Sequence, residues 1–166
     1  MTKMRIPAAA LAAALLLAGN ATAEEVIRHK TPNSDFPIAR AVEVPAGKTT
    51  VYVSGAVPSV VDEKADKGSI AAYGNTKTQT ESVLKSIDKT LADLGLKMGD
   101  VVKMQVFLVG DPDKGVKMDF GGFMEGYTQF FGTKEQPNLP ARSVMQVAGL
   151  VAPGWLVEIE VTAVRP

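Results

Sequence analysis

The chain has 166 residues, of which 46% are hydrophobic and 22% are charged, proportions typical of one globular domain. Basic and acidic residues are equal in number, so no excess of positive charge indicates nucleic-acid binding. There is no cysteine and only one histidine, His29, which excludes disulfides, thiol nucleophiles and a zinc site built from cysteine or several histidines. Chemistry is therefore expected from Arg, Lys, Asp, Glu, Tyr, Ser, Thr and backbone groups.

Residues 1–23 have the pattern of a secretory signal peptide. Lys3 and Arg5 precede an apolar stretch over 6–18, and Ala21-Thr22-Ala23 is a small-residue cleavage pattern. The stretch is short for a bilayer span, so we expect export to the periplasm or beyond, with no stable membrane anchor after cleavage. Residues 24–166 would then form the single mature domain, with 16 positive against 18 negative groups and a net charge of −2.

The first half of the mature chain is expected to contain strands over 26–29, 39–44 and 50–53. A turn at Pro45-Ala46-Gly47-Lys48 separates the second and third strands, which predicts that these two pair as an antiparallel hairpin. The segment 58–74 is irregular and charged. It is expected to be a loop.

A helix is expected next, beginning between Asn75 and Thr78 and ending at Gly95. Thr78-Gln79-Thr80-Glu81 fits a capping box, although Asn75 could cap an earlier start. One stripe of the helix is apolar or small and is expected to pack on a sheet: Thr76, Thr80, Val83, Leu84, Ile87, Leu91 and Leu94.

The second half is expected to contain a strand over 101–109, a helix over 120–131, a strand that follows Pro140 and a last strand over 155–164. Gly121, Gly122 and Gly126 weaken the helix, and close packing against a neighbour would explain them. Strands and helices alternate only in part, which indicates an α+β fold in which both helices cover one face of the sheet.

Arg142 follows Pro140 at the start of a predicted strand. From this position a guanidinium can bind a carboxylate through two hydrogen bonds. Glu158 and Glu160 share one face of the next strand. A Pro153-Gly154 turn joins the two strands, so antiparallel pairing is expected to bring a carboxylate near the guanidinium. These residues, with Ser54, could form a site for an α-keto or imino acid, or only a surface salt bridge.

Six segments, taken in order, resemble the RidA/YjgF family of enamine/imine deaminases. They are Val51-Tyr52-Val53-Ser54-Gly55-Ala56-Val57-Pro58, Gln79-Thr80 with Val83-Leu84, Asp100-Val101-Val102-Lys103 through Val106-Phe107-Leu108, Tyr127-Thr128-Gln129-Phe130-Phe131, Pro140-Ala141-Arg142-Ser143 with Gln146-Val147, and Val157-Glu158-Ile159-Glu160. Each segment is a weak signal alone, but together they are specific.

The resemblance implies a chorismate-mutase-like α+β fold, a mixed sheet with two helices on one face, and a homotrimer with ligand clefts between subunits. It implies that Arg142 binds the substrate carboxylate, that Glu158 handles a water proton, and that Ser54 and Gly55 line the cleft. The implied reaction converts a 2-imino or enamine acid to a 2-oxo acid and ammonia, without a metal or an organic cofactor.

The sequence departs from the family pattern at four cleft positions. Ile38 stands where the family has a tyrosine and Arg40 where it has a glutamine. Met124 replaces an asparagine, and Val144, whose carbonyl could assist Glu158, stands where cysteine or threonine is common. These changes make the cleft drier and add a possible second cation.

Two functions remain open. The first is a periplasmic imine deaminase. The second is a non-catalytic trimer that binds small carboxylates or acts like a chaperone. Ribonuclease activity, an older attribution for the family, is disfavoured by the net negative charge of the mature chain.

Overall fold

The computed structural model describes residues 25–166, so the expected signal peptide lies outside the described residues. The strands are β1 Ile27–Lys30, β2 Ala39–Glu43, β3 Thr50–Ala56, β4 Val101–Val109, β5 Ala141–Val147 and β6 Val157–Val164. The helices are α1 Thr76–Asp93 and α2 Phe120–Tyr127, and the short 3-10 turns are Ile70–Ala72, Met98–Asp100 and Pro112–Lys114. Within residues 25–166, no helix has the length and apolar character needed to cross a bilayer.

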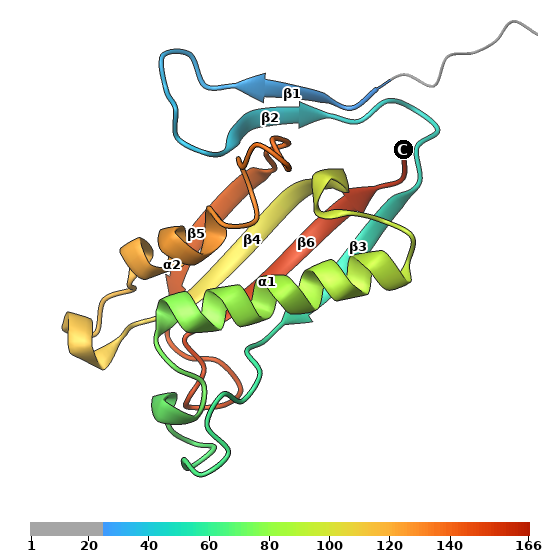
Figure 1. The fold of residues 1–166 in the computed structure, drawn as a ribbon. Coiled ribbons are helices and arrows are strands. Elements are labelled where there is room, and N and C mark those ends of the chain that lie inside the picture. Colours follow the sequence, from blue (N-terminus) through green and yellow to red (C-terminus); the bar gives the residue numbers. More distant parts are fainter. Residues whose placement is uncertain (1–24) are drawn as a thin grey trace, which may run out of the picture.

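The six strands form one mixed sheet in the order β1-β2-β5-β4-β6-β3. Strand β5 runs parallel to both β4 and β2, and the other neighbours are antiparallel. Both helices lie on the same side of the sheet, as Figure 1 shows. This arrangement confirms the expected α+β class, with a mixed sheet and two helices on one face.

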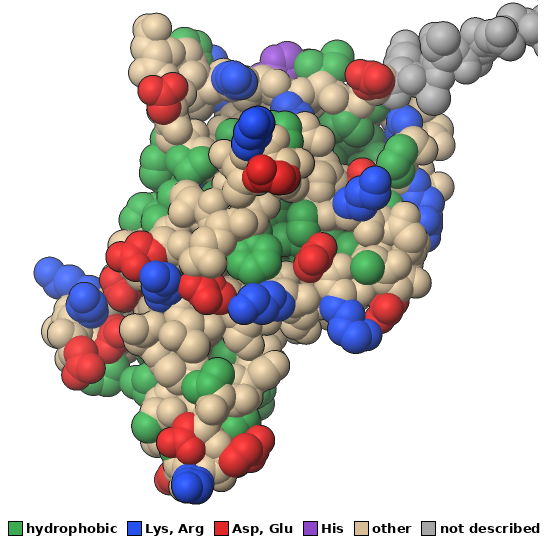
Figure 2. Space-filling view, viewed as in Figure 1, with side chains coloured by type: hydrophobic (Ala, Val, Ile, Leu, Met, Phe, Trp, Pro, Cys, Tyr) green, Lys and Arg blue, Asp and Glu red, His purple; other side chains and the backbone are tan. Residues whose placement is uncertain are grey.

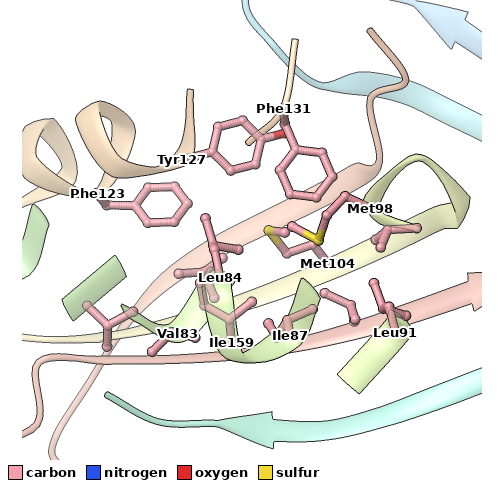
Figure 3. Packing of buried hydrophobic residues seen from close by; sticks show 14 of the residues in the cluster. Val83, Leu84, Ile87, Leu91, Met98, Met104, Phe123, Tyr127, Phe131 and Ile159 are labelled. Carbon is pink, nitrogen blue, oxygen red and sulfur yellow. The ribbon is translucent and has the colours of Figure 1, made fainter. Parts of the chain in front are cut away.

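The core lies between the helices and the central strands β4 and β6. The expected stripe of α1 is buried except for Leu94, which is 42% exposed at the end of the helix. Figure 3 shows Leu84 and Ile87 of α1 packed toward Met104 and Ile159 of the sheet, with the rings of α2 beside them.

Strand β4 alternates as expected, apart from its first residues. A register shift between Val101 and Lys103 places Val101, rather than Val102, in the core cluster.

Helix α1 begins at Thr76 and is capped by Asn75, whose side-chain oxygen accepts a hydrogen bond of 3.0 Å from the backbone nitrogen of Thr78. The alternative of an earlier start capped by Asn75 is therefore confirmed. The capping box at Thr78 does not form, because Thr78 already lies in the first turn. At the other end, Gly95 has a φ of 71°, the left-handed conformation that favours glycine after a helix.

Helix α2 is shorter than expected, ending at Tyr127 rather than at 131. Its glycines have low helix propensity, and the chain turns back at Gly132, which has a φ of 75°. The explanation by close packing is confirmed for Gly126, since an added Cβ would lie 2.8 Å from Cβ of Thr80 on α1.

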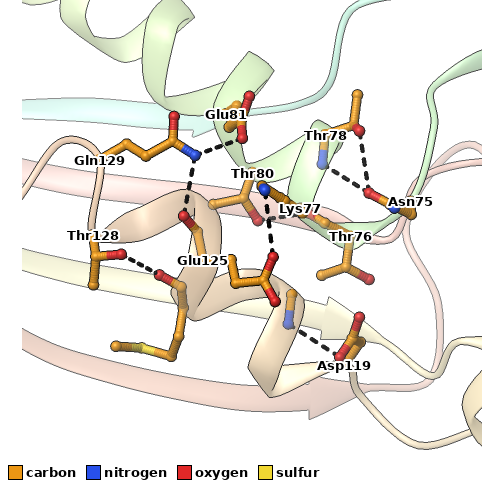
Figure 4. A network of polar contacts seen from close by, with 12 residues as sticks. Asn75, Thr76, Lys77, Thr78, Thr80, Glu81, Asp119, Glu125, Thr128 and Gln129 are labelled. Atoms are coloured by element: carbon orange, nitrogen blue, oxygen red, sulfur yellow. Dashed lines mark hydrogen bonds and ion pairs between the residues drawn. The ribbon is translucent and has the colours of Figure 1, made fainter.

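Polar contacts join the two helices around this close approach (Figure 4). Lys77 lies 3.4 Å from the carboxylate of Glu125, and the side-chain amide of Gln129 donates to Glu81 over 2.6 Å.

The predicted hairpin between residues 39–44 and 50–53 is wrong. Strand β2 pairs with β1 and β5, whereas β3 lies at the far edge of the sheet beside β6. The turn at Pro45 therefore leads to a strand that runs parallel to β2 and lies elsewhere in the sheet. Val51 and Val53 on β3 pack against the core, and only pairing with β6 places them there.

The predicted antiparallel pair of the Arg142 and Glu158 strands is also wrong. Strand β4 lies between β5 and β6. Because α2 carries the chain from the end of β4 back to the start of β5, these two strands are parallel neighbours, and β6 occupies the other side of β4. The Pro153-Gly154 turn therefore belongs to a longer connection rather than to a tight hairpin.

Candidate functional site

Arg142 lies near the start of β5, on the face of the sheet that the helices cover. Its register partner on β4 is Met104, which is fully buried on that face. Pro140 has no backbone N–H and keeps Leu139 extended, which defines where the strand begins. The carbonyl of Pro140 accepts a hydrogen bond of 3.0 Å from the nitrogen of Ala39 and holds β2 alongside. The Arg142 side chain consequently points toward α2.

Three aromatic rings and a thioether surround the guanidinium of Arg142. Its Cζ lies 4.1 Å from the ring centroid of Tyr127, 5.0 Å from that of Phe123 and 5.6 Å from that of Phe36. Nη2 lies 3.3 Å from Sδ of Met124, a weak acceptor, and the buried Nη1 has no hydrogen-bond partner. The rings stabilise the positive charge but do not satisfy its N–H groups, so the guanidinium retains donors for an acceptor such as a carboxylate.

Burial shifts the pKa values of Arg142 and of Tyr127, whose ring is the closest to the guanidinium. Burial lowers the pKa of Arg142, and the neighbouring Tyr127 acts in the opposite direction. Burial raises the pKa of Tyr127 to about 12, while the Arg142 cation acts to lower it. The Tyr127 hydroxyl donates to the carbonyl of Pro37 over 2.9 Å, a bond that requires the neutral phenol. At neutral pH the enclosure therefore holds a charged guanidinium beside an uncharged tyrosine.

Ser54, Gly55 and Glu158 gather on the opposite, helix-free face of the sheet. The register of β3 shifts between Val53 and Ala56, and a Cβ at Gly55 would collide with the carboxylate of Glu158. Glycine therefore permits the carboxylate to lie against the backbone of β3. Ser54 is exposed beside them and lines a hollow of about 350 Å³ on this face.

Glu160 also lines this hollow, together with Tyr52, Lys103 and Gln105. Glu158 and Glu160 share one face, as the alternation predicted. Both are half-buried, and the residues between and beside them point into the core.

Arg142 and Glu158 are not brought together within one chain. Arg142 faces α2, Glu158 faces away from the helices, and β4 separates their strands. The site expected from the sequence is therefore divided into an Arg142 half and a Glu158 half.

The remaining expected cleft residues lie mostly on the Arg142 side. Met124 contacts the guanidinium directly. Ile38 is half-buried in the segment that leads from Phe36 into β2, and Val144 packs against the core. Arg40 is exposed on β2. Arg142 and Met124 are thus joined by contact, whereas Ile38 and Val144 border their region.

Sequence reasoning missed the aromatic enclosure itself. Phe123 and Tyr127 lie within the helix expected over 120–131, but their rings also surround Arg142. Phe36 is not among the residues that the sequence predicts for the site. The spacing of Phe123 and Tyr127 was visible in the sequence, but their approach to Arg142 depends on the β4–α2–β5 connection.

The described residues contain no group of three or more His, Asp or Glu side chains that could hold a metal ion. On the face seen in Figure 2, Lys and Arg side chains are interspersed with Asp and Glu, and no continuous basic stripe crosses it. Residues 25–166 therefore do not indicate a metal centre, and the face in Figure 2 lacks the charge pattern of a nucleic-acid interface.

The fold and the enclosed guanidinium define an α+β protein of the chorismate-mutase-like class. The family model described as Endoribonuclease L-PSP matches residues 31–165. The chain belongs to this family, which is the RidA/YjgF family.

TdcF of Escherichia coli is 31% identical to this chain over 136 residues, which cover 82% of this chain and 92% of TdcF. TdcF is named as a reactive intermediate deaminase, but only provisionally. The crystal structure of E. coli TdcF with bound serine matches with a TM-score of 0.55 and 28% identity, covering 86% of this chain and 99% of that chain. YyfB of Yersinia pestis, a Rid family protein of unknown function, matches with a TM-score of 0.62 and 25% identity, covering 84% and 96% of the two chains.

Proposed function

We infer that this protein hydrolyses reactive 2-imino and enamine acids to 2-oxo acids and ammonia. The observation that carries this proposal is the Arg142 guanidinium, which is largely buried, keeps one N–H group without a partner and contacts only a thioether with another. A buried donor without an acceptor is costly, and a carboxylate is the acceptor whose two oxygens match the guanidinium edge. The relation to TdcF supports the same substrate class.

In the proposed reaction, Arg142 holds the carboxylate of the imino acid and so fixes the neighbouring imine carbon. Glu158 accepts a proton from a water molecule as the oxygen attacks that carbon. Glu158 passes this proton to the imine nitrogen, which gives an intermediate with a hydroxyl and an amino group on the same carbon. The hydroxyl proton then moves to the nitrogen as the carbon–nitrogen bond breaks, so that ammonia leaves and the oxygen remains as the new keto group. An enamine acid reaches the same imine when a proton moves from its nitrogen to its β-carbon. The backbone carbonyl of Val144 could help to orient the water.

The division of the site favours an assembly in which two chains complete each cleft. We propose a homotrimer in which Arg142 of one subunit faces Glu158 of the partner subunit. Ser54 and Gly55 lie beside Glu158 and would line the same wall of the cleft. The oligomeric state can be measured by sedimentation equilibrium.

We also propose that the chain is exported to the periplasm through the segment 1–23. Expression of the full chain in a Gram-negative host should yield a periplasmic protein whose first residue is Glu24. A cytoplasmic product that retains Met1 would contradict export.

The test of the proposed function is imine hydrolysis by the mature protein. An amino-acid oxidase generates imino acids in the presence of semicarbazide, and a loss of semicarbazone reports hydrolysis. Arg142→Ala should abolish imine hydrolysis, so that the semicarbazone signal is not reduced. Arg142→Lys should slow hydrolysis, because a single ammonium replaces the planar guanidinium that donates two parallel hydrogen bonds. Hydrolysis that persists in Arg142→Ala would contradict the assignment.

A non-catalytic role in binding small carboxylates is the second candidate. The contact between Met124 and the Arg142 guanidinium favours this role, because the thioether is not a group that could activate water. Here 2-oxo acids would bind in an Arg142-dependent way, without turnover of any imine. A chaperone-like role instead predicts suppression of client aggregation, measurable by light scattering.

A further inference from the structure

A row of aromatic rings runs from the guanidinium of Arg142 to the surface. Tyr127 and Phe123 are adjacent on α2, with ring centroids 5.6 Å apart, and Figure 3 shows them side by side. Phe120 follows at 6.1 Å from Phe123, and Phe36 lies 6.4 Å from Phe120 with its ring within 18° of parallel.

Exposure rises along this row. Tyr127 and Phe123 are fully buried, Phe120 is half-buried, and Phe36 is 44% exposed. Phe36 closes the row into a ring, since it stacks on Phe120 and also lies against the guanidinium of Arg142. The exposed rings therefore border the same guanidinium that has unused donors.

This geometry restricts what an Arg142-bound carboxylate can carry. In a 2-imino or 2-oxo acid, the side chain is attached to the same carbon that bears the carboxylate. The ring centroid of Phe36 lies 5.6 Å from Cζ of Arg142 and the ring stacks on Phe120, so these two rings form the exposed wall nearest to a side chain carried by an acid bound at Nη2. The wall there is apolar and aromatic, and an additional ring would extend the existing row in an offset or edge-on contact.

We propose that Phe36 and Phe120 select substrates with aromatic side chains. This inference rests on the proposed binding of the substrate carboxylate by Arg142. A branched aliphatic side chain gains burial against the same wall but no ring–ring contact, and a methyl group gains little of either. The expected order of preference is aromatic, then branched aliphatic, then methyl.

The test measures binding separately from turnover. Calorimetric titration of the mature protein with the 2-oxo acids that correspond to phenylalanine, leucine and alanine should give a Kd about tenfold lower for the first than for the last. In Phe36→Leu, which keeps an apolar side chain but removes the ring, only the affinity for the aromatic acid should fall, by about fivefold. Phe120→Leu should behave in the same way.

Leu94→Ala is the matched control. Leu94 is an exposed apolar residue at the C-terminal end of α1, the end remote from α2 in Figure 1, and its replacement should leave all three affinities unchanged. Arg142→Lys should weaken all three acids together.

The same ranking is then read from kcat/KM for the three imines. Equal affinities for the three acids, or an aromatic preference that survives both Phe36→Leu and Phe120→Leu, would overturn the inference. Aromatic-selective binding without turnover would refute the proposed hydrolysis and leave the inference standing. Turnover of the imines without an aromatic preference would refute the inference and support the proposed hydrolysis. If the protein neither bound nor turned over any of the acids, both the hydrolysis and the inference would be refuted.

Discussion

Arg142 and Glu158 lie on opposite faces of one sheet. The guanidinium points toward α2, and the carboxylate lies against Gly55 on the helix-free side. Two groups separated by a sheet cannot touch the same small substrate. If both act on it, they must come from different copies of the chain.

Mixing two inactive variants tests this consequence. Arg142→Ala and Glu158→Gln should each lack imine hydrolysis, whereas co-refolding them in equal amounts should restore about a quarter of wild-type activity, because clefts shared between chains then include some with both intact residues. Each variant refolded alone is the control. No recovery in a mixture shown to contain hybrid trimers would contradict the shared cleft.

Gly126 should be the least replaceable glycine of α2. In Gly126→Ala the new Cβ meets Cβ and Cγ2 of Thr80 at 2.8 and 2.9 Å, so the helices must separate and the free energy of unfolding should fall by about 1–3 kcal/mol. Urea denaturation measures the loss. Gly121→Ala is the matched control, since its Cβ would meet only the carboxylate of Asp119 at 3.6 Å, and it should be neutral or stabilising by up to about 1 kcal/mol. Equal losses in the two variants would refute this account.

Gln79 should be important for stability although it is polar. It is fully buried in α1, donates to the carbonyls of Gly74 and Gly154 over 2.9 and 3.0 Å, and accepts from the nitrogen of Leu156 over 2.7 Å. Gln79→Leu leaves these backbone groups without partners and should cost about 2–4 kcal/mol in urea denaturation.

Gln129→Leu provides the comparison for Gln79. Gln129 is exposed, and its loss should change stability by no more than about 0.5 kcal/mol. If Gln79→Leu were equally mild, the buried hydrogen bonds would not hold the start of α1 to the chain before β6.

Tyr127 should make stability fall at high pH. Its pKa is about 12 in the folded protein and near the ordinary 10 in the unfolded chain, so both states are protonated below pH 10 and only the unfolded state ionises between these values. Unfolding is therefore favoured as pH rises from about 10 to 12, by on the order of 1 kcal/mol at pH 11. Denaturation at pH 8 and pH 11 measures the change.

Tyr127→Phe isolates this effect. The variant loses the bond to Pro37 and should be less stable by about 1 kcal/mol at pH 8, but it lacks the ionisable group, so its deficit should shrink at pH 11. A deficit that is constant with pH would mean that Tyr127 ionises equally easily in both states.

Local patterns predicted the elements well but their partners poorly. The α1 stripe and the alternation of β4 were visible because each follows from the period of one element. The pairing of β3 with β6, and the position of β4 between β5 and β6, depend on long-range packing that no turn residue reports.

The candidate site shows the same limit. Arg142 was identified from its place at a strand mouth and from the family pattern, whereas its contacts with Phe36 and Phe123 follow from how β2 and α2 converge on β5. The expected meeting of Arg142 with Glu158 failed because it rested on strand order.

The ribbon of β1 and β2 is joined to the remaining sheet at few points. One register pair, Ala39 with Ala141, links it to β5, and the Arg28 guanidinium donates to the carbonyls of Gly99, Val101 and Leu139 over 2.7–2.9 Å. Phe36 belongs to the loop of this ribbon, whereas Arg142 belongs to a strand bound along its length to β4. Under the proposed roles of these two residues, substitutions in a peripheral loop would change the range of acids that the protein accepts. The residue that binds their shared carboxylate would stay fixed, because its strand is paired along its length with β4.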